Sequence, residues 1–478
     1  MSLSLVQTQL TKEVAQLAYQ HFAAYKEPAL QQRRFKHRDI LPLLERLRHN
    51  PLFDVRVVGK SVEQRDIYLI KAGTGKTKIL LWSQMHGDEP TATMALFDLF
   101  NFLQLSDAQD TVRQQILQQL TLYIVPMLNP DGAERYTRHN ALEIDLNRDA
   151  LRLQSPEARL LKHLRDTLNP EFGFNLHDQS RYYTVGSTPK PATISFLAPA
   201  FDHNQTVNPV RERAMRTIVG MNEALQQLIP GHVAKFSDEY EPRAFGDNIQ
   251  KWGTSVILIE SGGYPEDPEK QYIRQLNFAS IVSALHLISG NHYSVYPLED
   301  YYKIPENKRN LYDLLLRNVR YSRYGHEVLV DVGIFREEVD APHGKGFYHN
   351  SQIDQIGDLS IFHGYEEVDA TGLTLVPGKV YQKLFTSIND LEPLEIKGLL
   401  AQGYTTVQVE KLPESINPLE LPLNIISATS RVNHTLTLAS GANFMLQDGT
   451  GKFCYAIVNG FVYDMRSDLP ELFHGLVL

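Results

Sequence analysis

The chain has 478 residues, of which 42% are hydrophobic and 22% charged, a composition ordinary for a soluble globular protein. Its 47 basic and 56 acidic residues leave a formal net charge of -9, which argues against a nucleic-acid partner because phosphate binding needs concentrated Lys and Arg. No apolar run approaches the ~18 residues of a membrane span, and the length predicts two or three domains.

The cysteine content and the start of the chain bear on its compartment. Cys454 is the only cysteine, so no intrachain disulfide can form, which suits a reducing compartment. Residues 1–20 lack the basic and then apolar pattern of a secretory signal. We therefore predict a cytoplasmic protein, or a periplasmic or secreted one if a signal has been removed. The sequence gives no indication of the oligomeric state.

The first part of the chain predicts helices followed by strands. Residues 1–50 have the apolar spacing of helices, and Pro51 ends this N-terminal helical segment. Residues 55–61 and 65–70 then predict a β-hairpin. Between residues 51 and 295, apolar strand-like runs alternate with helical stretches. This alternation predicts an α/β domain with a mixed central sheet flanked by helices.

The segment Gly73-Thr74-Gly75-Lys76-Thr77 ends like a phosphate-binding loop. The P-loop pattern would need a glycine where the sequence has Ile70, and a strand rather than a helix follows Lys78. We therefore interpret the segment as a hairpin turn between two strands.

The character of the sequence changes after residue 295. Residues 296–325 are rich in Tyr, Pro and charge, and predict a connector that includes a helix over residues 310–319. From residue 326 to residue 478, short strand-like runs alternate with turns that contain Gly and Asp. This last region is predicted to be a smaller, mainly-β accessory domain.

The candidate chemistry begins with His86 and Glu89, which lie where an apolar strand, residues 79–82, gives way to a helix. A histidine and a glutamate at this spacing can both face one point in space. Imidazole and carboxylate are a usual ligand pair for catalytic zinc, which takes three protein ligands and leaves one position for water. The spacing alone is common by chance, so the hypothesis depends on the rest of the chain.

Polar residues follow the next strand, residues 120–125. Residues 129–132, Asn-Pro-Asp-Gly, have the composition of a turn. Beyond them lie an asparagine and several arginines: Arg135, Arg138, Asn147 and Arg148. These are either a solvated charge cluster or, beside a zinc site, groups that stabilise an oxyanion and bind a carboxylate.

His177 ends the apolar strand of residues 172–176, and Glu260 ends that of residues 256–259. His177 is either a hydrogen-bonded structural residue or a metal ligand, since ligands of open α/β sheets gather at the carboxyl ends of strands. Glu260 either makes a structural salt bridge or lies in a cleft where partial burial raises its pKa toward that of a general base.

In their order along the chain, these motifs resemble the zinc carboxypeptidases of the M14 metallopeptidase family over roughly residues 50–290. The resemblance rests on His-x-x-Glu, Asn-Pro-Asp-Gly, an Arg before Asp-x-Asn-Arg, and the His and the Glu at the two strand ends. It implies one zinc ion, held by His86, Glu89 and His177 with a water in the fourth position.

The resemblance also implies roles for the remaining residues. Glu260 would be the general base that takes the proton of the water and delivers it to the leaving amine. Arg138 would stabilise the oxyanion, a role that its distance from the Asn-Arg pair makes more suitable for it than for Arg135. Asn147 and Arg148 would bind the terminal carboxylate of the substrate.

Carboxypeptidases of this family usually carry a tyrosine on a mobile loop ahead of the catalytic glutamate. Tyr240 lies in the corresponding region, although the residues around it are not diagnostic. It is either a substrate-binding residue or a loop tyrosine without a catalytic part.

The C-terminal region carries a weaker resemblance. Residues 356–360, 368–378, 441–446 and 457–460 look like the small β-sandwich that flanks the barrel of amidohydrolases. The barrel and its His-x-His metal pair are missing from the sequence between them. We therefore predict an accessory domain without chemistry of its own.

The leading hypothesis is a zinc metallopeptidase that hydrolyses the C-terminal peptide bond of peptides with a free C-terminal carboxylate. One alternative keeps the scaffold but removes the acyl group of small N-acyl amino acids, although the Asn-Pro-Asp-Gly segment favours the peptidase. Another alternative is a catalytically inactive module that binds peptides or glycans. The complete set of ligand and base residues favours an enzyme over such a module.

Overall fold

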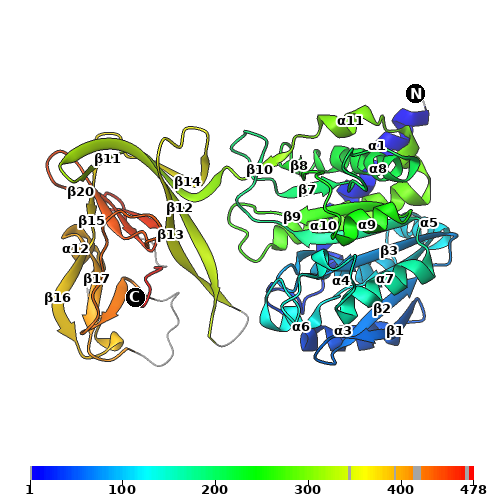
Figure 1. The fold of residues 1–478 in the computed structure, drawn as a ribbon, viewed down its shortest axis with the longest axis horizontal. Helices are drawn as coiled ribbons and strands as arrows, with labels where there is room; N and C mark the ends of the chain where they lie inside the picture. The colour runs from blue at the N-terminus through cyan, green and yellow to red at the C-terminus, as the bar shows by residue number, and fades with distance from the viewer. Residues whose placement is uncertain (1–2, 343–345, 392–394, 413–420, 469–472) are drawn as a thin grey trace. The chain divides into compact units, whose positions relative to one another are not determined.

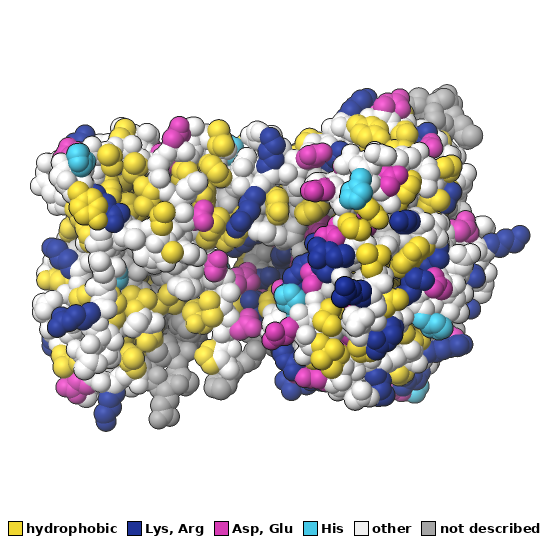
Figure 2. Space-filling view, in the orientation of Figure 1, with side chains coloured by type: hydrophobic (Ala, Val, Ile, Leu, Met, Phe, Trp, Pro, Cys, Tyr) yellow, Lys and Arg dark blue, Asp and Glu magenta, His cyan; other side chains and the backbone are white. Residues whose placement is uncertain are grey.

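The computed structural model describes residues 3–342, 346–391, 395–412, 421–468 and 473–478. The chain divides into two compact units, unit 1 over Met1–Arg309 and unit 2 over Asn310–Leu478 (Figure 1). Within the described ranges, no helix combines the length and the apolar character needed to cross a membrane. On the face shown in Figure 2, acidic, basic and hydrophobic side chains are mixed over the surface of each unit.

Unit 1 begins with helices and then alternates strands and helices. Its strands are β1 (Phe53–Lys60), β2 (Asp66–Ala72), β3 (Thr77–Ser83), β4 (Leu120–Val125), β5 (Phe172–Asp178), β6 (Thr184–Val185), β7 (Ile194–Leu197), β8 (Val233–Lys235), β9 (Ser255–Ser261) and β10 (Asn307–Lys308). Its helices are α1 (Leu3–Gln20), α2 (Phe22–Tyr25), α3 (His37–Arg48), α4 (Thr91–Gln104), α5 (Asp110–Gln119), α6 (Pro130–Arg135), α7 (Pro156–Leu168), α8 (Pro209–Leu225), α9 (Phe245–Lys251), α10 (Gln271–Ser289) and α11 (Glu299–Lys303), with short 3-10 turns η1 (Leu146–Arg148) and η2 (His292–Val295).

The main sheet of unit 1 has the strand order β1-β2-β4-β3-β5-β9-β7-β8. Strands β4, β3, β5 and β9 are parallel, whereas β1 with β2, β2 with β4 and β7 with β9 are antiparallel. The predicted mixed sheet and the β1–β2 hairpin are therefore confirmed. The predicted hairpin turn over residues 73–77 is wrong, because β4 lies between β2 and β3. Helices α4 and α5 follow β3 and lead into β4, which pairs with β3 in parallel. On its other edge, β3 pairs in parallel with β5.

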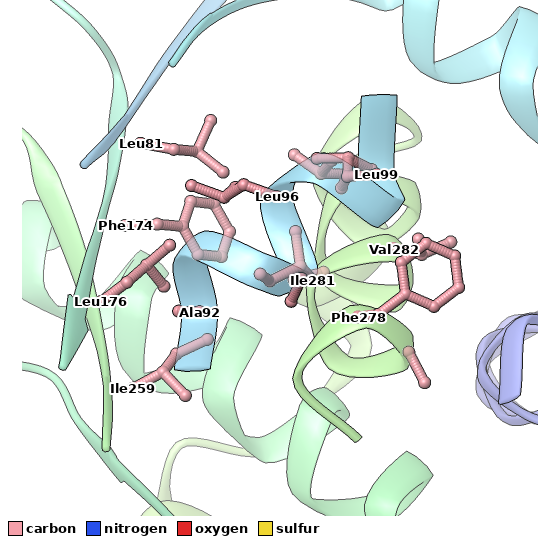
Figure 3. Close-up of a cluster of buried hydrophobic side chains, with 14 of the residues drawn as sticks. Leu81, Ala92, Leu96, Leu99, Phe174, Leu176, Ile259, Phe278, Ile281 and Val282 are labelled. Atoms are coloured by element: carbon pink, nitrogen blue, oxygen red, sulfur yellow. The ribbon is translucent and has the colours of Figure 1, made fainter. Parts of the chain in front are cut away.

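Helices cover both faces of this sheet. In β3, Leu81 packs into a cluster with residues of α4 and α10, while Leu80 and Trp82 pack into a second cluster with residues of α7 and α9. Figure 3 shows the first cluster, in which side chains of β3, β5 and β9 meet those of α4 and α10. Burial on both faces explains why these strands are continuously apolar. Each such side chain contributes about 1.5–3 kcal/mol by burial.

A histidine pair at the end of α10 predicts a pH-dependent stability. His286 is buried and its ring lies 5.3 Å from that of His292. Burial, and then the neighbouring His292, lowers the pKa of His286 to about 4. An unfolded histidine titrates near a pKa of about 6.5, so the unfolded chain binds the extra proton between these values and stability falls as the pH falls.

We therefore expect the free energy of unfolding to fall less between pH 7.5 and pH 5 in His286→Gln than in the wild type. The difference between the two proteins is expected to be up to about 1.4 kcal/mol for each pH unit below 6.5. Urea unfolding of the wild type and the variant at both pH values measures this difference. Equal pH dependence in the two proteins would contradict the prediction.

Unit 2 is rich in strands. They are β11 (Leu311–Arg323), β12 (His326–Asp340), β13 (Phe347–Gly357), β14 (His363–Asp369), β15 (Thr374–Pro377), β16 (Lys379–Phe385), β17 (Tyr404–Val409), β18 (Asn424–Ser427), β19 (Phe444–Gln447), β20 (Phe453–Val458) and β21 (Phe461–Asp464), together with α12 (Ile396–Ala401) and the 3-10 turn η3 (Ile388–Leu391). One sheet has the order β13-β12-β11-β15-β19-β20-β21 with β14 beside β11, and a smaller one has the order β16-β17-β18. The amidohydrolase resemblance of this unit stays a prediction.

The predicted helix over residues 310–319 is wrong, because these residues lie in strand β11. β11 pairs with β12 on one side and with β14 on the other, and its first residues are buried. The leucine-rich run has a good helix propensity. Pairing along both edges and burial in the core of unit 2 outweigh that local preference.

Candidate functional site

The predicted site residues gather at one edge of the unit 1 sheet. The parallel strands β3, β5 and β9 are neighbours, so their carboxyl ends lie side by side. His86 and Glu89 are in the segment between the end of β3 and the start of α4. In β5, His177 is paired in register with Glu260 of β9. The sheet therefore brings together residues that lie far apart in the sequence.

His86, Glu89 and His177 form a buried cluster of potential metal ligands, with one ligand atom from each residue within 4.8 Å of the other two. The Glu89 carboxylate lies between the two imidazoles. Its Oε1 is 2.8 Å from Nδ1 of His86, and its Oε2 is 2.6 Å from Nδ1 of His177.

The surroundings of His86 fit a bound cation. Its Nε2 lies 3.1 Å from Oδ1 of Asp145, which can accept a hydrogen bond from the Nε2–H and so leave Nδ1 available to bind a cation. Nδ1 lies 2.8 Å from Oε1 of Glu89, so either a proton or a metal cation must stand between these two atoms. Two imidazoles and a carboxylate are a donor set for a single zinc ion with an open position.

Electrostatics support the same conclusion. Burial lowers the pKa of His86, but Glu89 and Asp145 outweigh burial and raise it to about 9. Burial would raise the pKa of Glu89, yet the two histidines hold it well below its ordinary value. Burial lowers the pKa of His177, which keeps its imidazole neutral. A site that attracts a proton this strongly also attracts a divalent cation, and the metal would displace that proton.

The Asn-Pro-Asp-Gly segment supports the loop that carries His86. It was predicted as a turn, but Asn129 is the N-cap of α6, accepting a hydrogen bond from the Gly132 N–H at 2.9 Å. The Asn129 amide also donates to the carbonyl of Met85 at 3.2 Å. A Cβ on Gly87 would lie 1.9 Å from a backbone atom of Gly132, so the two loops pack backbone against backbone.

Arg138 reaches the metal ligands, whereas Arg135 does not. Nη1 of Arg138 lies 3.2 Å from Nδ1 of His86, and its Nε donates to Asp145 at 3.0 Å. Arg135 instead pairs with Glu63 outside the pocket. Of the two arginines, Arg138 is therefore the one that lies beside the metal ligands.

Glu260 faces the same pocket from the end of β9. Its Oε2 is buried and has no hydrogen-bond partner in the part of the chain that the structure describes. Burial, followed by the negative charges of Glu89 and Asp178, raises the pKa of Glu260 well above its ordinary value. A carboxylate with a raised pKa and a free oxygen is suited to accept a proton.

Asn147 and Arg148 lie on η1, against the start of α9. Oδ1 of Asn147 accepts the Phe245 N–H at 2.9 Å, and Asn147 lines the pocket. Nε of Arg148 lies 3.3 Å from Oε2 of Glu241. A substrate carboxylate bound by Arg148 would therefore compete with Glu241. Tyr240 lies beside them, with its ring 5.0 Å from that of His203.

All the predicted site residues line one pocket of about 540 Å³. They are His86, Glu89, Arg138, Asn147, Arg148, His177, Tyr240 and Glu260. Sequence reasoning missed the role of Asp145, which contacts the ring of His86. Asp145 stands within the Asp-x-Asn-Arg motif, so adjacency to that motif was the available signal.

Known proteins resemble a part of the chain that contains the metal triad. A family model described as zinc carboxypeptidase, Peptidase M14, matches residues 42–179. Carboxypeptidase SOL1 of Arabidopsis thaliana is 32% identical over 126 residues, which are 23% of this chain and 26% of that protein. Probable carboxypeptidase 2 of Trichophyton verrucosum is 28% identical over 192 residues, which are 38% of this chain and 32% of that protein.

The chain thus spans between about a quarter and a third of the length of these curated relatives. Among solved structures, a metallo-carboxypeptidase from Pseudomonas aeruginosa aligns with a TM-score of 0.45 and 21% identity, over 54% of this chain and 70% of that one. The ligand triad is assembled as the motifs predict, and residues 42–179, which contain it, match the model of the M14 family of zinc carboxypeptidases.

Proposed function

We propose that unit 1 hydrolyses the C-terminal peptide bond of peptides that end in a free carboxylate. The observation that carries this proposal is the convergence, in one pocket, of the metal triad, a carboxylate with a raised pKa and an arginine pair. A zinc ion held by His86, Glu89 and His177 would acidify a water molecule and polarise the scissile carbonyl.

The chain's own residues supply the rest of the chemistry. Glu260 accepts the proton that the attacking water loses and returns it to the leaving amine. The guanidinium of Arg138 faces the negative charge that develops on the carbonyl oxygen. Arg148 and the NH2 group of Asn147 hold the terminal carboxylate and so fix which bond is presented. Tyr240 closes one wall of the pocket against the substrate.

Arg148→Met tests the capture of the terminal carboxylate. A charge-assisted hydrogen bond is worth about 1.5–3 kcal/mol, so we expect kcat/KM for peptides with a free carboxylate to fall by about tenfold to a hundredfold. Arg243→Met is the matched control, because Arg243 also pairs with Glu241 but does not line the pocket.

The substrate panel contains each peptide with a free and with an amidated C-terminus. The wild type is expected to prefer the free carboxylate, and Arg148→Met is expected to lose that preference. Equal cleavage of both forms by the wild type would contradict the role of Arg148. Hydrolysis of N-acyl amino acids without any peptide cleavage would favour the deacylase alternative.

A further inference from the structure

Asp178 lines the pocket beside the metal triad. It ends β5 directly after His177, and its side chain is only 6% exposed. Its Oδ2 accepts hydrogen bonds from Thr91 Oγ1 at 2.5 Å and from Lys270 Nζ at 3.1 Å. Its Oδ1 is buried and has no partner among the described residues. A buried carboxylate oxygen without a donor costs free energy, which a donor on a ligand would recover.

The Asp178 side chain is held in a fixed orientation. Lys270, which is the N-cap of α10, also donates to the carbonyl of Ser261 at 3.0 Å and is largely buried. Thr91 is the first residue of α4. The carboxylate is therefore tied to the ends of two helices and of β9, which fixes the orientation of this pocket residue.

Asp178 and Arg148 lie at opposite sides of the sheet edge. The helices α4 and α10, which anchor Asp178, cover one face of the sheet. Helix α9, whose first N–H binds Asn147, covers the other face. The metal triad stands at the end of β3 and β5 between them. A peptide with its carboxylate at Arg148 and its scissile carbonyl beside the triad therefore extends toward Asp178.

We propose that Asp178 is a substrate-binding residue whose Oδ1 accepts a hydrogen bond from the backbone N–H of the penultimate residue of the peptide. This inference rests on the proposed function, since it assumes that the C-terminal peptide bond lies at the triad. The penultimate residue is the one whose carbonyl is attacked, so this hydrogen bond fixes the acyl side of the scissile bond as Arg148 fixes the other side. Lys270 and Thr91 act as positioning residues for Asp178.

A chemical double-mutant cycle tests the proposal. Two N-acylated dipeptides are compared, one with glycine and one with N-methylglycine at the penultimate position, on the zinc-loaded wild type and on Asp178→Asn. The amide can still accept from Lys270 and Thr91 while its NH2 group replaces the free acceptor. We expect kcat/KM of the wild type to fall about tenfold or more on N-methylation.

With Asp178→Asn, kcat/KM for the glycine peptide is expected to fall by a similar factor, mainly through KM. N-methylation of the peptide is then expected to lower kcat/KM of this variant by less than about a further threefold. If N-methylation lowers kcat/KM by the same factor in Asp178→Asn as in the wild type, the proposal is overturned. Glu239→Gln makes the same chemical change at an exposed position of the pocket and is expected to retain the full discrimination against N-methylation. Zinc content and thermal unfolding verify that each variant is loaded and folded.

Lys270→Met provides a second test if Asp178→Asn does not fold. In Lys270→Met, which lacks the anchor, the ratio of kcat/KM for the glycine peptide to that for the N-methylglycine peptide is expected to fall below about threefold. Lys270→Arg is expected to restore the ratio of the wild type. Unchanged discrimination in Lys270→Met would overturn the proposal. Equal hydrolysis of both peptides by the wild type would overturn this inference alone, whereas hydrolysis of neither would overturn the proposed function.

Discussion

Changing Glu260 to Gln is expected to lower kcat for peptide hydrolysis by about a hundredfold to ten-thousandfold. Glu260 lies at the pocket end of β9, in register with His177, and no other carboxylate of the pocket combines a raised pKa with a buried free oxygen at this position, as far as the described residues show. Glutamine keeps the shape of the side chain but cannot accept and return a proton. The loss should therefore appear in kcat rather than in KM.

The zinc content of the variant distinguishes this role from that of a ligand. Glu260 is not among the residues whose ligand atoms converge, so Glu260→Gln is expected to keep one zinc ion per chain. Glu239→Gln, at the exposed rim of the same pocket, is the control for loss of a carboxylate. Activity within tenfold of the wild type, or loss of zinc from Glu260→Gln, would show that another residue is the base.

Changing Arg274 to Met is expected to lower the unfolding free energy by about 3–5 kcal/mol. Arg274 of α10 and Asp98 of α4 are both fully buried, with Nε of the arginine 2.6 Å from Oδ2 of the aspartate. The arginine also binds the backbone carbonyls of Glu27 and Leu30. Without the arginine, Asp98 would be left as an unpaired charge in the core.

Urea unfolding measures this loss, and two variants control it. Asp98→Leu combined with Arg274→Met removes both charges and is expected to recover part of the lost stability. Lys303→Met breaks an ion pair whose lysine is 72% exposed, so it is expected to change stability by less than about 1 kcal/mol. A loss below about 1 kcal/mol for Arg274→Met would show that the buried pair is not a stabilising link between α4 and α10.

The sequence predicted His86, His177 and Glu260 because each of them lies at the end of a buried strand or just after it. Parallel strands with both faces covered leave long apolar runs, and the first polar residue after such a run lies at the sheet edge where ligands bind. This is how His86, His177 and Glu260 could be identified together. The family resemblance added their order and the expectation of zinc.

Other features depended on contacts that spacing does not reveal. The pairing of Arg148 with Glu241 and the anchoring of Asp178 by Lys270 join residues that are far apart in the sequence. The Asn129 segment has the composition of a turn, and only its packing on the His86 loop gives it the role of a helix cap. The leucine-rich start of β11 was predicted as helix because local propensity does not include pairing on both edges.

The strand order of the main sheet could not be predicted from the sequence either. The chain passes from β2 to β3 through a short connection with Gly73 at a φ of +79°, which is typical of a hairpin. The two strands are nevertheless not neighbours, because β4, which follows them in the sequence, lies between them in the sheet. Sheet order depends on how the strands of the whole unit pair rather than on one turn.

The central claim is that the two imidazoles and the carboxylate of the triad bind one zinc ion. Anomalous scattering at the zinc absorption edge, from crystals of the zinc-loaded protein, tests it most directly. We predict one peak per chain, enclosed by His86, Glu89 and His177 and facing Glu260 across the pocket. A peak at any other place, or none at saturating zinc, would contradict the account.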